Sequence, residues 1–204
     1  MTTMRFFAIG SWTEGMLHFK KLAPFIVSYE SATIHAHAYR LPVGFPVLAA
    51  PISGTADEIT GQLIEIKQDD TLLTLMDFMH GVHLKDANKS LHTRHEISVY
   101  TNMGTVENKV QVYLFNPKKL SAKAVRIQGG VWKESMTLNP PLIDQLTEKQ
   151  KIYVLKLGSV KGRDIVPIND LPLYRELMKL ELIVDKGRRL ALSSLGKEVY
   201  NHLA

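Results

Sequence analysis

The stretch FFAIGSW, residues 6–12, is a short apolar run that ends at a glycine, Gly10. Residues 4–9 contain one charged side chain, and Ser11 and a second glycine, Gly15, follow soon after. An apolar run that stops at glycine is typical of a β-strand leading into a tight loop. The sequence therefore predicts a first strand over residues 4–9 with a turn directly after it.

Four further segments carry strand patterns. Residues 25–41 are rich in Val, Ile, Thr, Tyr and Ala, and residues 59–66, ITGQLIEI, suit a half-buried strand. Residues 95–101 and 109–115 alternate apolar and polar side chains on either side of the turn-forming residues 102–104. We expect the last two segments to pair as antiparallel strands.

One helix is expected within this first part of the chain. Residues 71–79 carry leucines and methionines at helical spacing, and the acidic residues Asp69 and Asp70 precede them. Gly81 follows the stripe and predicts its end. Strands and a helix mixed in this way predict an α+β fold.

Asn139-Pro140-Pro141 predicts a domain boundary, because two adjacent prolines do not fit inside a helix or a central strand. We therefore expect one domain over residues 1–138 and a smaller one over residues 139–204. A chain of 204 residues suits one domain of ordinary size with a small appendage.

The second part predicts the order helix, helix, strand hairpin, helix. Thr147 and Gln150 have capping-box spacing before an apolar stripe that Gly158 is expected to close. Residues 171–182 repeat the helical pattern, and residues 183–192 predict strand, turn and strand before a last helix from about residue 194. The phrase KGRRLALSSLGKEV, in residues 186–199, resembles the wing and last helix of bacterial winged-helix modules.

Composition limits the classes of function. Hydrophobic residues make up 45% and charged residues 22%, which is ordinary for a folded protein, and the net charge is +5. The absence of cysteine excludes disulfides, thiol nucleophiles and cysteine-ligated zinc, and fits a reducing compartment. No segment has the features of a signal peptide or a membrane helix, so we expect a cytoplasmic protein. No phosphate-binding glycine loop or dinucleotide fingerprint occurs, and we expect no cofactor.

Five features in order, FFAIGSW, GFPVL, ITGQLIEI, LMDFMHGV and VYLF, together resemble the gamma-glutamylcyclotransferase-like family over about residues 4–116. The resemblance implies a small mixed β-barrel with flanking helices. It also implies a reaction in which a gamma-glutamyl amine or peptide becomes 5-oxoproline and a free amine. A small gamma-glutamyl ligand is the partner that this resemblance implies.

The resemblance places a ligand site at the loop after the first strand. The family loop reads Tyr-Gly-Ser or Thr-Leu, and the matching residues are Ile9, Gly10, Ser11 and Trp12, of which Gly10 and Ser11 match. Backbone N–H groups of such a glycine turn converge on a carboxylate or a developing oxyanion. The alternative is a plain turn at the end of a strand.

The second departure concerns the acid/base residue. The family carries Leu-Asp-x-x-Glu-Gly after the helix, and this chain has MDFMHG over residues 76–81, so His80 stands at the glutamate position. The reaction takes a proton from the α-amine and gives one to the leaving nitrogen. Histidine transfers protons near neutral pH but does not offer an anionic carboxylate. His80 is therefore the candidate catalytic residue, and a turn histidine in a protein whose catalysis is lost or changed is the alternative.

Other candidate residues carry weaker patterns. Tyr113 lies on a strand similar to the family's late tyrosine-bearing strand, where it either hydrogen-bonds a ligand or packs. Two His-x-x-His pairs, His80 with His83 and His92 with His95, suit loop histidines better than a metal site, so we expect no metal.

The C-terminal module carries a basic candidate wing with Lys186, Arg188 and Arg189. This pattern favours contact with DNA or a protein partner, although acidic residues such as Asp185 interrupt the basic surface. A solvated surface is the alternative.

The sequence thus leaves two hypotheses. In the first, the barrel binds, and cyclises, a gamma-glutamyl ligand with His80 at the catalytic position. In the second, the barrel is a non-catalytic ligand sensor whose C-terminal module contacts DNA or another protein.

Overall fold

The computed structural model describes residues 2–51, 55–160, 170–187 and 189–204. The chain divides into two compact units. Unit 1 contains Met1–Leu41 and Phe45–Leu138, and unit 2 contains Pro42–Gly44 and Asn139–Ala204.

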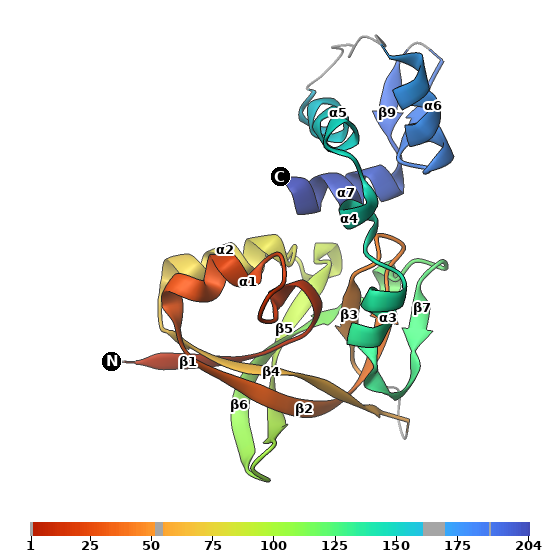
Figure 1. Ribbon diagram of the computed structural model, residues 1–204. Coiled ribbons are helices and arrows are strands. Elements are labelled where there is room, and N and C mark those ends of the chain that lie inside the picture. The colour runs from red at the N-terminus through yellow and green to blue at the C-terminus, as the bar shows by residue number, and fades with distance from the viewer. Residues whose placement is uncertain (1, 52–54, 161–169, 188) are drawn as a thin grey trace. The chain divides into compact units, whose positions relative to one another are not determined.

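Unit 1 is a small mixed β-barrel (Figure 1), which confirms the expected α+β fold class. Its strands are β1 (Thr3–Ala8), β2 (Ile26–Arg40), β4 (Asp57–Lys67), β5 (His92–Thr101) and β6 (Val106–Phe115). Antiparallel pairing joins β1 to β4, β4 to β2, β2 to β5 and β5 to β6. Parallel pairing of β1 with β6, at Phe6 opposite Gln111, closes the ring. The predicted hairpin of β5 and β6 is confirmed.

Two shorter strands extend this sheet. β3 (Pro46–Ala49) pairs with β2 and contacts β6, and β7 (Val125–Ile127) pairs with β2. A 3₁₀ turn, Gln128–Gly130, and helix α3 (Trp132–Leu138) follow β7 and complete unit 1.

Helix α2 (Asp70–Met79) forms where its sequence predicts it. The Asp69 carboxylate accepts hydrogen bonds from the backbone N–H groups of Thr71 and Leu72, which satisfies donors that the first helical turn leaves open. The helix packs on one face of the barrel sheet, together with the short helix α1 (Phe19–Leu22). The shared core consists of Phe6, Ala8, Leu22, Ile64, Ile66, Leu72, Met76 and Tyr113.

Unit 2 has the predicted order of helix, helix, strand hairpin and helix, preceded by a short helix, α4 (Leu142–Gln145), that was not predicted. Its other described elements are α5 (Glu148–Ser159), α6 (Leu171–Lys179), β8 (Ile183–Asp185), β9 (Leu190–Leu192) and α7 (Ser194–Leu203). The capping box is confirmed, because Thr147 and Gln150 exchange side-chain and backbone hydrogen bonds at the start of α5. The expectation that Gly158 ends this helix is wrong. Gly158 lies inside α5, where a Cβ atom would stand 2.2 Å from the ring of Tyr200.

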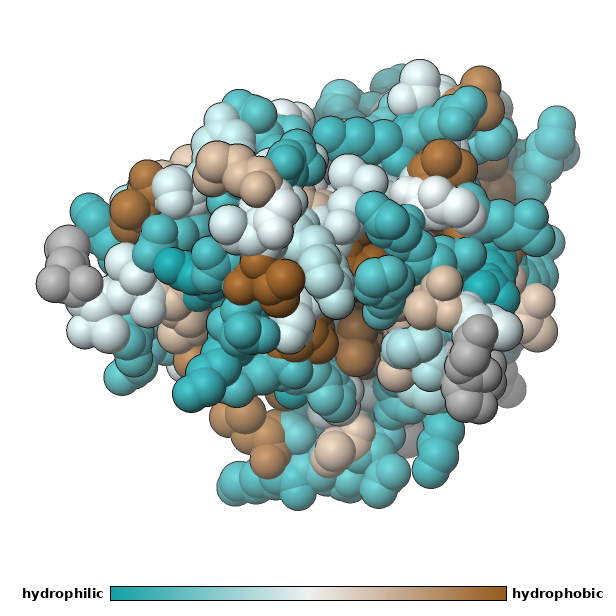
Figure 2. Space-filling view, turned by 90° about the horizontal axis from the view of Figure 1, so that it is seen from below, coloured by the Kyte–Doolittle hydropathy of each residue, from teal (hydrophilic) through white to brown (hydrophobic). Residues whose placement is uncertain are grey.

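The face shown in Figure 2 is mostly hydrophilic, with separate apolar patches between the polar side chains. Among the described residues, no helix is both long enough and apolar enough to cross a membrane.

Candidate functional site

The turn after β1 is a single 3₁₀ turn, Gly10–Trp12, and it depends on glycine. Gly10 has φ +61°, and a Cβ atom there would lie 2.8 Å from Cγ of Pro46. The backbone N–H and the hydroxyl of Thr13 both donate to the carbonyl of Gly10, at 3.1 and 2.9 Å. Two hydrogen bonds from Thr13 therefore close the turn, and Gly10 and Ser11 are buried in it.

Ser11 makes a contact that the sequence reasoning missed. Its Oγ lies 2.9 Å from Nδ1 of His18, and the backbone N–H of His18 donates to the Ser11 carbonyl at 2.7 Å. Ser11 and His18 are 7% and 6% exposed, so the pair is shielded from solvent. The Trp12 ring packs on the imidazole of His18, with ring centroids 4.9 Å apart. A serine and a histidine seven residues apart in a loop give no periodic signal in the sequence.

His80 lies just after α2, in a stack of aromatic rings. Its imidazole is parallel to the Tyr113 ring at a centroid distance of 3.6 Å, and Trp12 stacks with the imidazole at 4.7 Å. Nδ1 of His80 donates to the Met76 carbonyl at 2.8 Å, in the last turn of the helix. The structure thus brings Trp12, His80 and Tyr113 together, three of the residues that the sequence selected. The contact distances leave no gap between the imidazole and the phenol ring.

The surroundings of His80 favour its neutral form. Burial lowers the pKa of His80 well below its ordinary value, and the neighbouring His92 and His18 lower it further, while the hydrogen bond to Met76 acts in the opposite direction. Burial also lowers the pKa of His92 to about 4, against the effect of its Nδ1 hydrogen bond to the His80 carbonyl at 2.7 Å. His80 is therefore a neutral and weak base at neutral pH.

Asp77 is the carboxylate that reaches this cluster. The Tyr113 hydroxyl donates to Oδ1 of Asp77 at 2.7 Å, and a guanidinium nitrogen of Arg94 lies 3.6 Å from the same oxygen. Burial, followed by the hydrogen bond to Asp77, raises the pKa of Tyr113 above its ordinary range. Tyr113 therefore serves as a protonated donor to Asp77, and Asp77 is occupied by its two partners.

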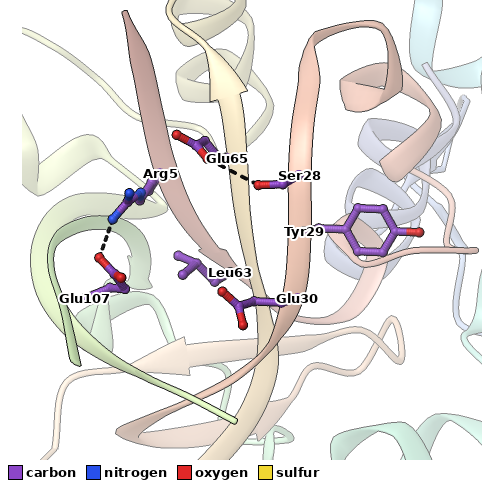
Figure 3. A pocket seen from close by; sticks show the side chains of 7 residues that line it. All are labelled: Arg5, Ser28, Tyr29, Glu30, Leu63, Glu65 and Glu107. Atoms are coloured by element: carbon purple, nitrogen blue, oxygen red, sulfur yellow. Dashed lines mark hydrogen bonds and ion pairs between the residues drawn. The ribbon is translucent and has the colours of Figure 1, made fainter. Parts of the chain in front are cut away.

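A separate hollow of about 120 Å³ lies on the other face of the sheet (Figure 3). Neighbouring strand residues point to opposite faces, so Arg5 and Glu65 point away from the core that contains Phe6 and Ile64. Glu65 accepts hydrogen bonds from Thr3 at 2.6 Å and Ser28 at 3.2 Å, and Arg5 pairs with Glu107. Glu65 therefore does not supply a carboxylate to the turn at Gly10.

The remaining sequence candidates lie elsewhere. His83 and His95 are exposed, and His95 bonds to the hydroxyl of Thr93. In the described part of the chain, no three His, Cys, Asp or Glu residues are grouped to hold a metal ion. Lys186 and Arg189 flank the turn of the hairpin β8–β9 in unit 2, and Arg188 lies outside the described residues.

No protein-family model matches this sequence, and no curated protein matches it. Solved structures that resemble it include YkqA from Bacillus subtilis, with 16% identity and a TM-score of 0.48 over 67% of this chain and 42% of that protein. An AIG2-like protein from Mus musculus has 15% identity and a TM-score of 0.45, over 59% of this chain and 86% of its own. A gamma-glutamyl cyclotransferase has 15% identity and a TM-score of 0.44, over 87% and 99%. The chain spans less than half the length of YkqA.

Proposed function

We propose that unit 1 binds a gamma-glutamyl amine or peptide at the turn of Gly10 and Ser11, converts its gamma-glutamyl group into 5-oxoproline and releases the free amine. The observation that carries this proposal is the turn itself. It is buried, it requires glycine at its first residue, and it presents Ser11 beside an imidazole. The sequence resemblance to gamma-glutamylcyclotransferase-like proteins assigns ligand binding to the same residues.

Binding is tested by calorimetric titration of the full chain with a panel of gamma-glutamyl amines and peptides, alongside an assay for 5-oxoproline. Gly10→Ala is expected to abolish binding, because it strains the backbone and meets Pro46. Gly15→Ala is the matched control, since Gly15 also has positive φ but a Cβ atom there would meet no other atom within 4 Å. The proposal would be overturned if no compound of the panel binds and none yields 5-oxoproline.

His80 packs the site in this proposal and does not act as its acid/base. Its ring is neutral, it lies against Trp12 and Tyr113, and its Nδ1 proton is used by the Met76 carbonyl. A weakly basic imidazole is a poor acceptor for the proton of an α-ammonium group.

His80→Gln and His80→Phe are therefore expected to release 5-oxoproline within about threefold of the wild-type rate, because the first keeps a hydrogen-bond donor and the second keeps a stacked ring. A general acid/base contributes about 10²–10⁴-fold to a rate. Loss of about 100-fold or more in both variants, with ligand binding unchanged, would establish His80 as the acid/base and reject its packing role.

A second candidate function belongs to unit 2, where we infer contact with DNA. The supporting observation is a short hairpin after α6 whose turn is closed by a hydrogen bond from the Lys186 N–H to the Arg189 carbonyl at 3.0 Å. Basic residues at such a turn suit contact with phosphates.

The double variant Lys186→Ala, Arg189→Ala is expected to weaken binding of the full chain to random duplex DNA. The slope of log K against log salt is negative, and each lost phosphate contact should reduce its magnitude by about 0.9. Lys197→Ala, which changes an exposed lysine on α7, is the control. An unchanged slope, or no binding at low salt by the wild-type chain, would reject the DNA contact.

A further inference from the structure

The hydrogen-bonded pair of Ser11 and His18 has the geometry of a nucleophile and its base. We propose that Ser11 attacks the amide carbonyl of the bound gamma-glutamyl ligand, with His18 as the proton acceptor, so that amide cleavage passes through an ester on Ser11. The identity of the substrate rests on the proposed function, whereas the pairing of the two side chains does not.

Distance and orientation support these roles. Oγ of Ser11 and Nδ1 of His18 are 2.9 Å apart, within the 2.6–3.2 Å range of activated nucleophiles. The backbone of His18 is held on both sides, because its N–H donates to the Ser11 carbonyl and its own carbonyl accepts from the Lys21 N–H at 3.0 Å. The Trp12 ring packs against the imidazole. A base whose orientation is fixed transfers a proton without first being reoriented.

The backbone around Ser11 also suits a nucleophile. Ser11 directly follows the left-handed Gly10, between strand β1 and the short helix α1. A sharp turn at the end of a strand lifts a serine hydroxyl out of the sheet, as the nucleophile elbow of hydrolases does. Burial of both side chains strengthens their interaction, because the local dielectric constant is lower than that of water.

The proposed steps balance in atoms and protons. Oγ forms a bond to the γ-carbonyl carbon while its proton moves to Nδ1 of His18, and the C–N bond then breaks as His18 returns that proton to the leaving amine. The ligand's α-ammonium group releases one proton to solvent, and the resulting α-amine attacks the ester carbonyl. The C–Oγ bond breaks, the amine loses a proton to His18, and Ser11 recovers it, which gives 5-oxoproline and the free enzyme.

This route accounts for turnover without a glutamate at the position of His80. The base is supplied by His18 from the loop after β1, and the carboxylate of Asp77 stays with Tyr113 and Arg94. His80 stacks on the Trp12 ring and takes no part in proton transfer.

The test uses a fluorophosphonate probe on the full chain, with intact mass and peptide mapping as readouts. We expect a single adduct on Ser11, no adduct in Ser11→Ala, and labelling about 100-fold slower in His18→Gln, as general-base catalysis predicts. Ser90→Ala is the matched control. Ser90 is also buried, but its hydroxyl accepts a hydrogen bond from the backbone N–H of His83 and not from an imidazole.

An adduct on another residue, the absence of an adduct in the wild-type chain, or a labelling rate that is unchanged in His18→Gln would each overturn the proposal. Near-ultraviolet circular dichroism and thermal unfolding of every variant show whether it folds. Calorimetric binding without labelling leaves the proposed function in place and rejects the nucleophile. Labelling of Ser11 without binding of any gamma-glutamyl compound rejects the substrate and keeps the pair.

Discussion

Replacing Trp132 with alanine is expected to lower the free energy of unfolding of unit 1 by about 3–5 kcal/mol, the range measured when a large aromatic side chain is removed from a core. The Trp132 side chain is 2% exposed, and its Nε1 donates to the Thr60 carbonyl on β4 at 2.5 Å. The substitution leaves a cavity and also removes the donor of a part-buried carbonyl. Urea unfolding followed by far-ultraviolet circular dichroism measures the change.

Two controls sharpen this experiment. Trp132→Phe keeps most of the buried ring and loses the hydrogen bond, so its loss should be smaller than that of the alanine variant. Leu138→Ala alters a residue of the same helix that is 72% exposed, and a change within about 0.5 kcal/mol is expected. If Trp132→Ala and Leu138→Ala unfold at the same urea concentration, the buried Trp132 side chain does not contribute to the stability of unit 1.

Acid is expected to destabilise unit 1 through the buried histidines. The pKa of His92 falls from its ordinary value near 6.5 to about 4 in the folded chain, so the unfolded chain binds more protons below pH 6.5. Stability should therefore decrease as the pH falls from about 6.5, and the contribution of His92 should level off below pH 4. Its total is at most about 3 kcal/mol. His80 adds to the loss in the same direction.

His92→Gln should make the stability of unit 1 less dependent on pH between 6.5 and 4, because glutamine keeps a donor for the His80 carbonyl and does not titrate. Chemical unfolding at several pH values gives the slope. His95→Gln, at an exposed histidine of the same strand, is the control and should retain the wild-type slope. Equal slopes in all three proteins would show that protonation of the His92 ring does not lower the free energy of unfolding.

Local signals allowed most elements to be predicted. Asp69 identified the start of α2, and the reciprocal Thr147 and Gln150 bonds identified the start of α5, because a cap involves residues only a few positions apart. The strands β5 and β6 followed from alternation on either side of a turn. The segment that forms β7 and α3 was not predicted, since Trp132 is placed by a contact with Thr60, 72 residues away.

The candidate site was predicted in part. The turn at Gly10 and Ser11 followed from glycine after an apolar run, and its need for positive φ agrees with that reasoning. The stack of His80 with Trp12 and Tyr113 joins three distant segments, which no single segment of sequence can indicate. His18 was missed for a related reason, because loop geometry decides which imidazole meets Ser11.

The parallel pairing of β1 with β6 has a consequence for the nascent chain. Phe6 pairs with Gln111, so the barrel cannot close until the chain has left the ribosome as far as β6. Contacts between residues this far apart in sequence slow folding, because a long loop must first be ordered. During that interval β1 can pair with β4 but not with β6, so one of its two edges stays open to other strands.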